Sequence, residues 1–287
     1  MYRILATESL APNVHLFRVE APRVAAKARA GQFVIVRVCE EGERIPLTIA
    51  DWDEEEGSVT IVFMAVGTST YRLARLKAGD SICGFVGPLG VPSEIEKFGT
   101  VVCVCGGYAV APIFPIARAL KKAGNRIISI QGARSKDLLF WTDRVAEYSD
   151  EMIVTTDDGS HGRKGLVTEP LEEILKREKV GRVIAIGPSV MMKFCARTTE
   201  PFGVKTIVSL NPIMVDGTGM CGCCRVLVGG ETKFACVDGP EFDGHLVDWD
   251  NLMARQKTYL EEEKRSLERW RGKHEPGCCG AASEERK

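Results

Sequence analysis

The chain has 287 residues, 45% of them hydrophobic, which is enough for two compact domains and an appendage. Its formal net charge of -1 gives no global attraction to nucleic acid, and no apolar run of about 18 residues could form a transmembrane helix. The first residues do not follow a basic region with an apolar core, so we expect no signal peptide and a cytoplasmic location in which thiols stay reduced.

The first segment, residues 1–97, predicts an antiparallel barrel. Short runs of alternating polarity are separated by glycine, proline and acidic clusters, and they cover residues 15–19, 32–38, 58–64 and 80–86. A helix is expected to interrupt them at about residues 69–76, because Lys-Ala-Gly follows it as a stop signal.

Two motifs in this segment could hold a flavin. Arg44–Thr48 places an arginine and a hydroxyl beside a strand, where they could hold the flavin phosphate and the isoalloxazine edge. Val66–Thr70 places small hydroxyl residues at a helix N-terminus, where free backbone N–H groups suit a pyrophosphate. Each motif has a structural alternative, since Ser69 could be a plain N-cap and Pro46 could mark a strand edge.

The second segment, residues 98–210, alternates apolar strands with helices and predicts a parallel doubly wound sheet. Strands are expected at residues 101–105, 126–130, 152–156, 182–186 and 205–210, and helices at 111–123, 167–177 and 190–199. Ligands of such sheets bind at the carboxyl ends of the strands. The loops expected there are 106–109, 132–135, 157–160 and 187–189.

These loops predict a nucleotide site without fixing its ligand. Gly106-Gly107 permits close approach of a pyrophosphate, although the strict GxGxxG spacing is absent and the pair could simply form a tight turn. Arg134 could contact an adenosine 2'-phosphate or line a solvated loop, so the choice between NAD and NADP stays open. Asp158 lies in the corresponding loop after the next strand.

The third segment, residues 211–250, contains the spacing Asp216-x4-Cys221-x2-Cys224-x11-Cys236. A C-x4-C-x2-C…C arrangement is typical of plant-type [2Fe–2S] sites, and aspartate stands here in the first position. Loop glycines would let backbone amides turn towards the inorganic sulfides. Zinc is the chemical rival, although a structural zinc site usually shows paired CxxC knuckles and one pair occurs here.

The identity of the fourth residue that would bind the cluster stays open. Asp216 fits the spacing, but it could be an ordinary turn residue, and Cys223 could replace it or point away as a spare thiol. The cysteines in apolar runs are expected to be small core residues, and they are Cys39, Cys83, Cys103, Cys105 and Cys195.

The last segment, residues 251–287, predicts a charged helix over residues 251–273 that packs on one face. Its end is expected to be disordered, and the vicinal Cys278 and Cys279 could bind a stray metal or have no role. The predicted domains are therefore 1–97, 98–210 and 211–250, followed by a helix and tail at 251–287.

In order, these motifs resemble the ferredoxin–NADP reductase superfamily with an appended [2Fe–2S] domain. Within it, the chain resembles the electron-transfer subunits of dihydroorotate dehydrogenase. It resembles still more the small (alpha) subunits of NADH-dependent reduced ferredoxin:NADP oxidoreductases, which are electron-bifurcating transhydrogenases, and the related sulfide dehydrogenase beta subunits. The distinguishing residue is Asp216, because the dihydroorotate subunits have cysteine at that position.

The resemblance implies FAD, NAD(H) and [2Fe–2S] cofactors and assigns residues to them. The residues implied at the flavin are Arg44, Pro46, Leu47, Thr48, Val62, Phe63, Met64, Gly67, Ser69 and Thr70. Those implied at the nicotinamide nucleotide are Gly106, Gly107, Ala111, Pro112, Gly187 and Pro188. Two glycines usual in the family are replaced, by Ser69 and Ala109.

The implied function is electron transfer. NAD(H) would exchange a hydride with FAD, and single electrons would pass through the cluster to or from a larger iron–sulfur flavoprotein subunit. The resemblance implies that this partner subunit carries a second FAD, [4Fe–4S] clusters and an NADP(H) site. Electrons would reach ferredoxin through the partner. Two alternatives stay open: a dihydroorotate-oxidising or other flavoprotein partner, and a carrier module that has lost nucleotide binding. No catalytic acid or base is expected.

Overall fold

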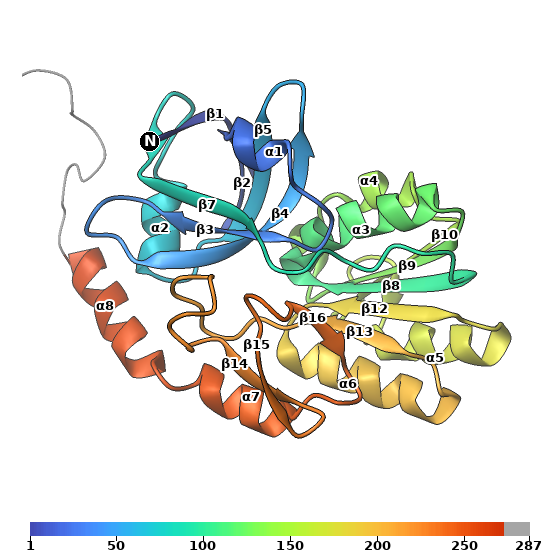
Figure 1. The fold of residues 1–287 in the computed structure, drawn as a ribbon. Coiled ribbons are helices and arrows are strands. Elements are labelled where there is room, and N and C mark those ends of the chain that lie inside the picture. The colour runs from blue at the N-terminus through green and yellow to red at the C-terminus, as the bar shows by residue number, and fades with distance from the viewer. Residues whose placement is uncertain (273–287) are drawn as a thin grey trace, which may run out of the picture.

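The structure is a computed structural model that describes residues 1–272, and its first third is a seven-stranded antiparallel barrel-like sheet (Figure 1). The strand order is β6-β1-β2-β5-β4-β3-β7. The strands are β1 (Tyr2–Ala11), β2 (Val14–Glu20), β3 (Phe33–Arg37), β4 (Arg44–Asp53), β5 (Ser58–Met64), β6 (Ser81–Ile82) and β7 (Gly84–Leu89). Two short helices accompany them, α1 (Pro22–Ala25) and α2 (Thr68–Ala74). The predicted barrel is confirmed.

Alternating polarity builds the barrel because every second side chain of a strand faces its interior. Phe17 of β2 and Phe63 of β5 meet there edge to face, with ring centroids 5.2 Å apart, and Phe85 of β7 is also fully buried. Strand β1 was not predicted, since its residues Tyr2–Ala11 are exposed or half-buried apart from the buried Ile4 and show no clean alternation.

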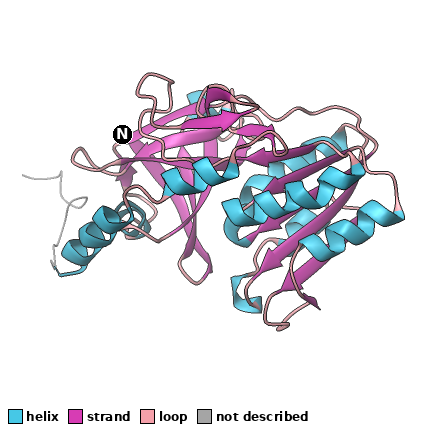
Figure 2. Cartoon of the chain, turned by 90° about the horizontal axis from the view of Figure 1, so that it is seen from below, coloured by secondary structure: helices cyan, strands magenta, loops and turns pink. Residues whose placement is uncertain are grey.

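The second sheet follows the barrel in the chain and has the order β11-β10-β9-β8-β12-β13-β16, and its strands from β11 to β13 run parallel. These strands are β8 (Thr100–Gly106), β9 (Arg126–Ala133), β10 (Glu151–Thr156), β11 (Arg163–Lys164), β12 (Arg182–Ile186) and β13 (Thr206–Ser209). The helices are α3 (Val110–Lys122), α4 (Thr142–Ala146), α5 (Thr168–Arg177) and α6 (Ser189–Thr199), with 3-10 turns at Gly107–Ala109, Lys136–Leu138 and Glu200–Phe202. Figure 2 shows helices flanking this sheet. The predicted doubly wound sheet is confirmed.

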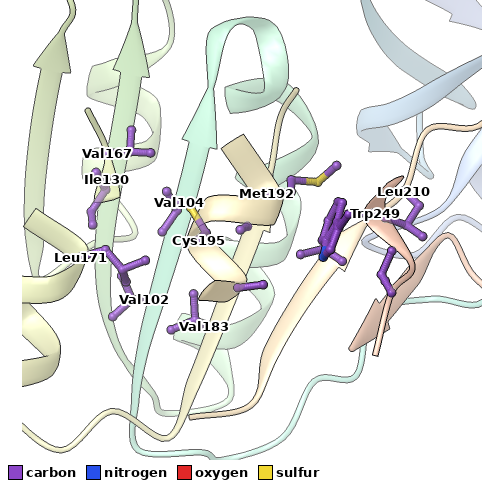
Figure 3. Close-up of a cluster of buried hydrophobic side chains, with 14 of the residues drawn as sticks. Val102, Val104, Ile130, Val167, Leu171, Val183, Met192, Cys195, Leu210 and Trp249 are labelled. Carbon is purple, nitrogen blue, oxygen red and sulfur yellow. The ribbon is translucent and has the colours of Figure 1, made fainter. Parts of the chain in front are cut away.

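The cysteine-containing segment contributes to the core of that sheet. Strand β16 (Glu241–Asp243) pairs antiparallel with β13, and Trp249 and Leu252 lie in the same buried cluster as Val208. Figure 3 shows Trp249 beside Leu210 in this cluster. The remaining strands of the segment, β14 (Arg225–Val228) and β15 (Glu231–Phe234), form a separate two-stranded sheet. The boundaries predicted at residues 97, 210 and 250 stay a prediction.

The predicted single C-terminal helix is corrected to two helices. Helix α7 (Trp249–Gln256) begins at Asp248, whose side chain caps it by accepting the Asn251 N–H, and α8 (Leu260–Gly272) follows after a turn. Cys278 and Cys279 lie outside the described residues. Within residues 1–272, no helix is long and apolar enough to cross a membrane.

Candidate functional site

The Arg44–Thr48 motif lies on the outer face of the barrel. In the antiparallel pairing of β3 and β4, Pro46 is opposite Ile35 and Thr48 is opposite Phe33, so these four side chains share one face. Leu47 packs towards the opposite face, in the barrel core. Pro46, Leu47 and Thr48 are half-buried and Arg44 is exposed.

Strand β5 extends this outer face. Val62 and Met64 pack outside the barrel, in a buried cluster that also contains Ala109 and Val110, and β5 contacts the 3-10 turn Gly107–Ala109. Phe63 points the other way and is buried in the barrel core at 1% exposure. The structure therefore separates Phe63 from its neighbours, because successive side chains of a strand alternate between faces. Only the backbone of Phe63 is available on the predicted flavin side.

The Val66–Thr70 motif begins α2, and its hydroxyl residues have distinct roles. The Thr70 hydroxyl accepts N–H groups from Val66 and Gly67, each at 3.0 Å, and so fixes the entry to the helix. Gly67 is the N-cap residue, and Ser69 lies in the first turn. The alternative prediction of Ser69 as the N-cap is therefore wrong.

The predicted nucleotide residues lie at the carboxyl ends of neighbouring strands of the parallel sheet. The strands β10, β9, β8 and β12 are neighbours, so the loops that carry Asp158, Arg134, Gly106 and Gly187 follow one another in that order. The Asp158 N–H donates to the Arg134 carbonyl at 3.2 Å, which joins two of these loops. The Asp158 carboxylate accepts from Ser160, and this contact holds its pKa below the ordinary value.

The central loops require glycine for two different reasons. A Cβ atom at Gly106 would lie 2.5 Å from the Met191 sulfur, so this glycine permits close packing of the end of β8 against helix α6. Gly107 has φ +61°, and a Cβ atom there would meet no atom within 4 Å, so its backbone faces open space that a ligand could occupy. Ala111 and Pro112 are buried in the first turn of α3 and pack rather than face this space.

The cysteine loop brings two of its thiols together. Cys224 and Cys236 are both buried, and their sulfur atoms are 3.2 Å apart without a disulfide. Two thiolates on one tetrahedral metal ion at about 2.3 Å would be separated by about 3.8 Å, so a small movement would admit an ion between them. Burial raises the pKa of Cys236 to about 12, so binding a metal there would release a proton.

The other half of the loop contains Asp216, Cys221 and Cys223. The Asp216 carboxylate accepts the Thr218 N–H at 2.8 Å and the Cys221 N–H at 2.9 Å, and the first contact holds its pKa below the ordinary value. The Cys223 N–H lowers the pKa of the Cys221 thiol, and that thiol contacts both Asp216 and Cys223. Either of these two side chains could therefore join Cys221 as a ligand.

This donor set fits a two-iron cluster better than one zinc ion. Across residues 1–272, no three His, Cys, Asp or Glu side chains converge as ligands of a single ion. A [2Fe–2S] cluster needs two pairs of ligands, one for each iron. Cys224 with Cys236 supplies one pair, and Cys221 with Asp216 or Cys223 supplies the other. Gly217, Gly219 and Gly222 all have positive φ, so the loop turns as the sequence predicted.

The cysteine loop packs directly on the outer face of the barrel. Cys224 and Cys236 share a buried cluster with Phe33 and Ile35 of β3. A Cβ atom at Gly217 would lie 2.7 Å from Ile35 and from Leu89 of β7, so only glycine permits this approach. Figure 1 shows the loop in orange below β3. The site prediction missed Phe33 and Ile35, and the unbroken apolar run over residues 33–36, which is typical of a strand buried on both faces, is the signal that could have found them.

Comparison with known proteins supports this reading of the loop. Residues 211–248 match the family described as the iron–sulfur cluster binding domain of dihydroorotate dehydrogenase B. A Thermotoga maritima relative, described as a homolog of the dihydroorotate dehydrogenase B (NAD(+)) electron transfer subunit, is 52% identical over 93% of this chain and 94% of its own length. The electron transfer subunit of Clostridium perfringens is 32% identical over 78% of this chain and 89% of its own length.

Solved structures give the same result. A chain in the structure of an NADH-dependent reduced ferredoxin-NADP oxidoreductase, studied for flavin-based electron bifurcation, is 51% identical, has a TM-score of 0.89, and matches over 94% of this chain and 98% of its own. A Neisseria gonorrhoeae ferredoxin NADP+ reductase shares the fold, with 20% identity, a TM-score of 0.60, and coverage of 70% of this chain and 90% of its own. The predicted resemblance is confirmed: this chain belongs to the family of dihydroorotate dehydrogenase B electron transfer subunits and their homologues, which are oxidoreductase subunits.

Proposed function

We propose that the chain binds FAD, NAD(H) and a [2Fe–2S] cluster and transfers electrons between NAD(H) and a larger partner subunit in a ferredoxin- and NADP(H)-linked, electron-bifurcating transhydrogenase. The observation that carries this proposal is the shared face of β3 and β4. Phe33 and Ile35 contact the cysteine loop there, and Thr48 and Pro46 of the flavin motif lie directly opposite them. Neighbouring strands are about 4.8 Å apart, so the two sites adjoin.

Each cofactor has residues of this chain assigned to it. Arg44, Pro46 and Thr48 would hold the flavin, with Val62 and Met64 along it and Gly67 at its pyrophosphate. Gly107 and Gly187 would lie at the nicotinamide nucleotide, with Arg134 and Asp158 further along the edge. Cys221, Cys224 and Cys236 would hold the cluster, with Asp216 as the fourth ligand.

When bound, a flavin exchanges a hydride with a nicotinamide and passes electrons singly to an iron–sulfur cluster. The chain's own contribution is position and exclusion of water. Met64 and Val62 pack beside Ala109, so strand β5 lies next to the loop that follows β8 and contains Gly107. The buried Cys224 and Cys236 place half of the cluster against the barrel, away from solvent.

Anaerobic titration of the purified, flavin-loaded chain with NADH tests this function. We expect NADH to bleach the flavin absorbance and then to reduce the cluster, with an EPR signal for the reduced [2Fe–2S] centre. Absence of bleaching would contradict the proposal and would instead support the carrier module that has lost nucleotide binding.

A dihydroorotate-oxidising partner is the second candidate, because the matched cluster-binding family and several relatives carry that description. Asp216 favours the bifurcating assembly, since the resemblance gives cysteine at that position in the dihydroorotate subunits. Co-purification from the native cell separates the two candidates. We expect a partner that carries a second FAD, [4Fe–4S] clusters and NADP(H)-dependent activity, whereas a partner that oxidises dihydroorotate would favour the second candidate.

A further inference from the structure

The C-terminal helix α8 and helix α2 of the barrel enclose a pocket of about 420 Å³. Such a volume lies within the range of about 300–1,000 Å³ that is usual for small-molecule sites. Its lining is Thr68 and Arg72 from α2 and Glu262, Arg265, Ser266, Arg269 and Trp270 from α8, so three arginines face a single carboxylate. In Figure 1, α8 lies beside α2 at the end of the barrel remote from the parallel sheet.

A few specific contacts hold α8 in this position. Trp270 stacks on Tyr71 of α2 with ring centroids 5.7 Å apart, and the Arg75 guanidinium lies 4.3 Å from the Trp270 ring centre. The Thr68 and Ser266 hydroxyls are 3.0 Å apart. No side chain of α8 is fully buried, and a helix of 13 residues is marginal by itself in water. A ligand that contacts both helices would therefore stabilise α8.

The charge of the pocket favours a polyanionic ligand. Within residues 1–272, neither Arg72 nor Arg269 forms an ion pair, and Arg265 is the one lining arginine with a carboxylate partner, Glu262 at 3.1 Å. Guanidinium groups together with the hydroxyls of Thr68 and Ser266 are a donor set that suits phosphate oxygens. The half-buried Trp270 adds an aromatic wall.

We propose that α8 completes the flavin site by binding the adenosine diphosphate end of FAD in this pocket. The proposal rests on the proposed function, because Thr68 belongs both to the pocket lining and to the Val66–Thr70 motif assigned to the flavin pyrophosphate. Arg72 and Arg269 would pair with the two phosphates. The isoalloxazine end would extend from here along the outer face of the barrel.

Binding of FAD and FMN to the full chain stripped of flavin tests this proposal, with fluorescence quenching as the readout. Charge-assisted hydrogen bonds contribute about 1.5–3 kcal/mol, so Arg269→Gln should weaken FAD binding about 10-fold or more. FMN lacks the adenosine phosphate half, so its affinity should not change. Lys264→Gln is the matched control: Lys264 is exposed on α8 and does not line the pocket, so its loss should change FAD affinity less than twofold.

Hydrogen exchange of the wild-type chain provides a second readout. FAD should slow amide exchange in residues 260–272, and FMN should leave it unchanged. Free ADP should compete with FAD for the stripped chain. ADP that binds the FAD-loaded chain without displacing FAD would overturn the proposal and show a separate nucleotide site.

The outcomes separate this inference from the proposed function. A chain that binds no flavin at all contradicts the proposed function itself. A chain that binds FAD normally, with Arg269→Gln equal to wild type and no exchange protection of α8, leaves the function standing and overturns only the role of α8.

Discussion

Asp216 is the residue on which the ligand set of the cluster depends. Its two carboxylate oxygens already accept the Thr218 and Cys221 N–H groups, so it shapes the loop whether or not it also binds iron. If it is a ligand, Asp216→Cys should retain the cluster with altered EPR g values, since thiolate is a softer ligand than carboxylate. Asp216→Ala should lower the iron content. Iron analysis and EPR of the reduced chain measure both effects.

Two further variants separate the roles of this loop. Asp216→Asn removes the charge and keeps one oxygen, which can accept only one of the two backbone N–H groups, so it retains part of the turn without the carboxylate ligand. Cys223→Ser should leave the EPR signal as in wild type. An unchanged signal in both Asp216→Cys and Asp216→Ala would remove Asp216 from the ligand set, and a signal altered by Cys223→Ser would give the fourth position to Cys223.

Glu241 couples the stability of the fold to pH. Burial raises its pKa from 4.5 to about 7, even though the Ser93 hydroxyl donates to it at 2.6 Å. The fold therefore favours the protonated form, and this contribution to stability is full below about pH 4.5 and is lost as the pH rises through about 7. Glu241→Gln removes the titration, so its free energy of unfolding should not fall with Glu241 ionisation. Between pH 5 and pH 8 the wild type should therefore lose about 1–3 kcal/mol of unfolding free energy more than the variant does.

Denaturant unfolding of the two proteins at pH 5 and pH 8 measures this difference. Ser93→Ala serves as a comparison, because it removes the hydroxyl donor while leaving the titrating group in place. Equal pH dependence in wild type and Glu241→Gln would contradict the assignment of the effect to Glu241.

At the scale of elements, the contact between the cysteine loop and the barrel depends on Gly217. Gly217→Ala adds a methyl group 2.7 Å from Ile35 and Leu89 at a position with φ +75°. Gly222→Ala is a matched control, because its φ is +68° and its nearest neighbour, Phe234, is 3.8 Å away. Both carry a backbone cost of about 1–2 kcal/mol, and Gly217→Ala should lose about 1–3 kcal/mol more through overpacking.

Thermal or denaturant unfolding of both variants gives the difference between them. Gly217→Ala should also bind less iron than wild type, because the cysteine loop would move away from β3. Two variants of equal stability would show that the loop does not pack on the barrel as described.

The elements predicted best were those with a strong period. Strand β8 and helices α3, α5 and α6 were expected within a few residues of their observed bounds, because their apolar residues repeat at the spacing of a strand or helix. Helix α4, with only residues Thr142–Ala146, is too short to show a period and was missed. Strand β16 was missed because three residues that pair at a sheet edge leave no periodic signal.

At the scale of the whole molecule, the cysteine segment and the parallel sheet should fold together. Trp249 and Leu252 share a core with Val208, and β16 covers the β13 edge. A chain that ends at residue 210 should therefore aggregate, because it exposes that core and an unpaired strand edge. A chain that ends at Gln256 keeps these contacts and should remain folded. Soluble yield and thermal unfolding compare the two.

A well-folded product from the shorter chain would contradict this coupling and would support a domain boundary at residue 210. The barrel and the parallel sheet are also joined through Asp51 of β4, which accepts from Arg118 at 2.8 Å and from Arg144 at 3.0 Å. These contacts hold helices α3 and α4 of the parallel-sheet part beside strand β4 of the barrel.

The sequence by itself determined the barrel, the parallel sheet and the cluster spacing, because each follows from local periodicity or from ligands close together along the chain. Only the tertiary structure decided which faces meet. The pairing of Pro46 with Ile35 and the approach of Gly217 to Ile35 place the flavin motif and the cysteine loop on one surface. The packing of α8 against α2 was likewise decided only by the tertiary structure. Such contacts link residues far apart in the sequence, and their energies depend on packing that no local pattern encodes.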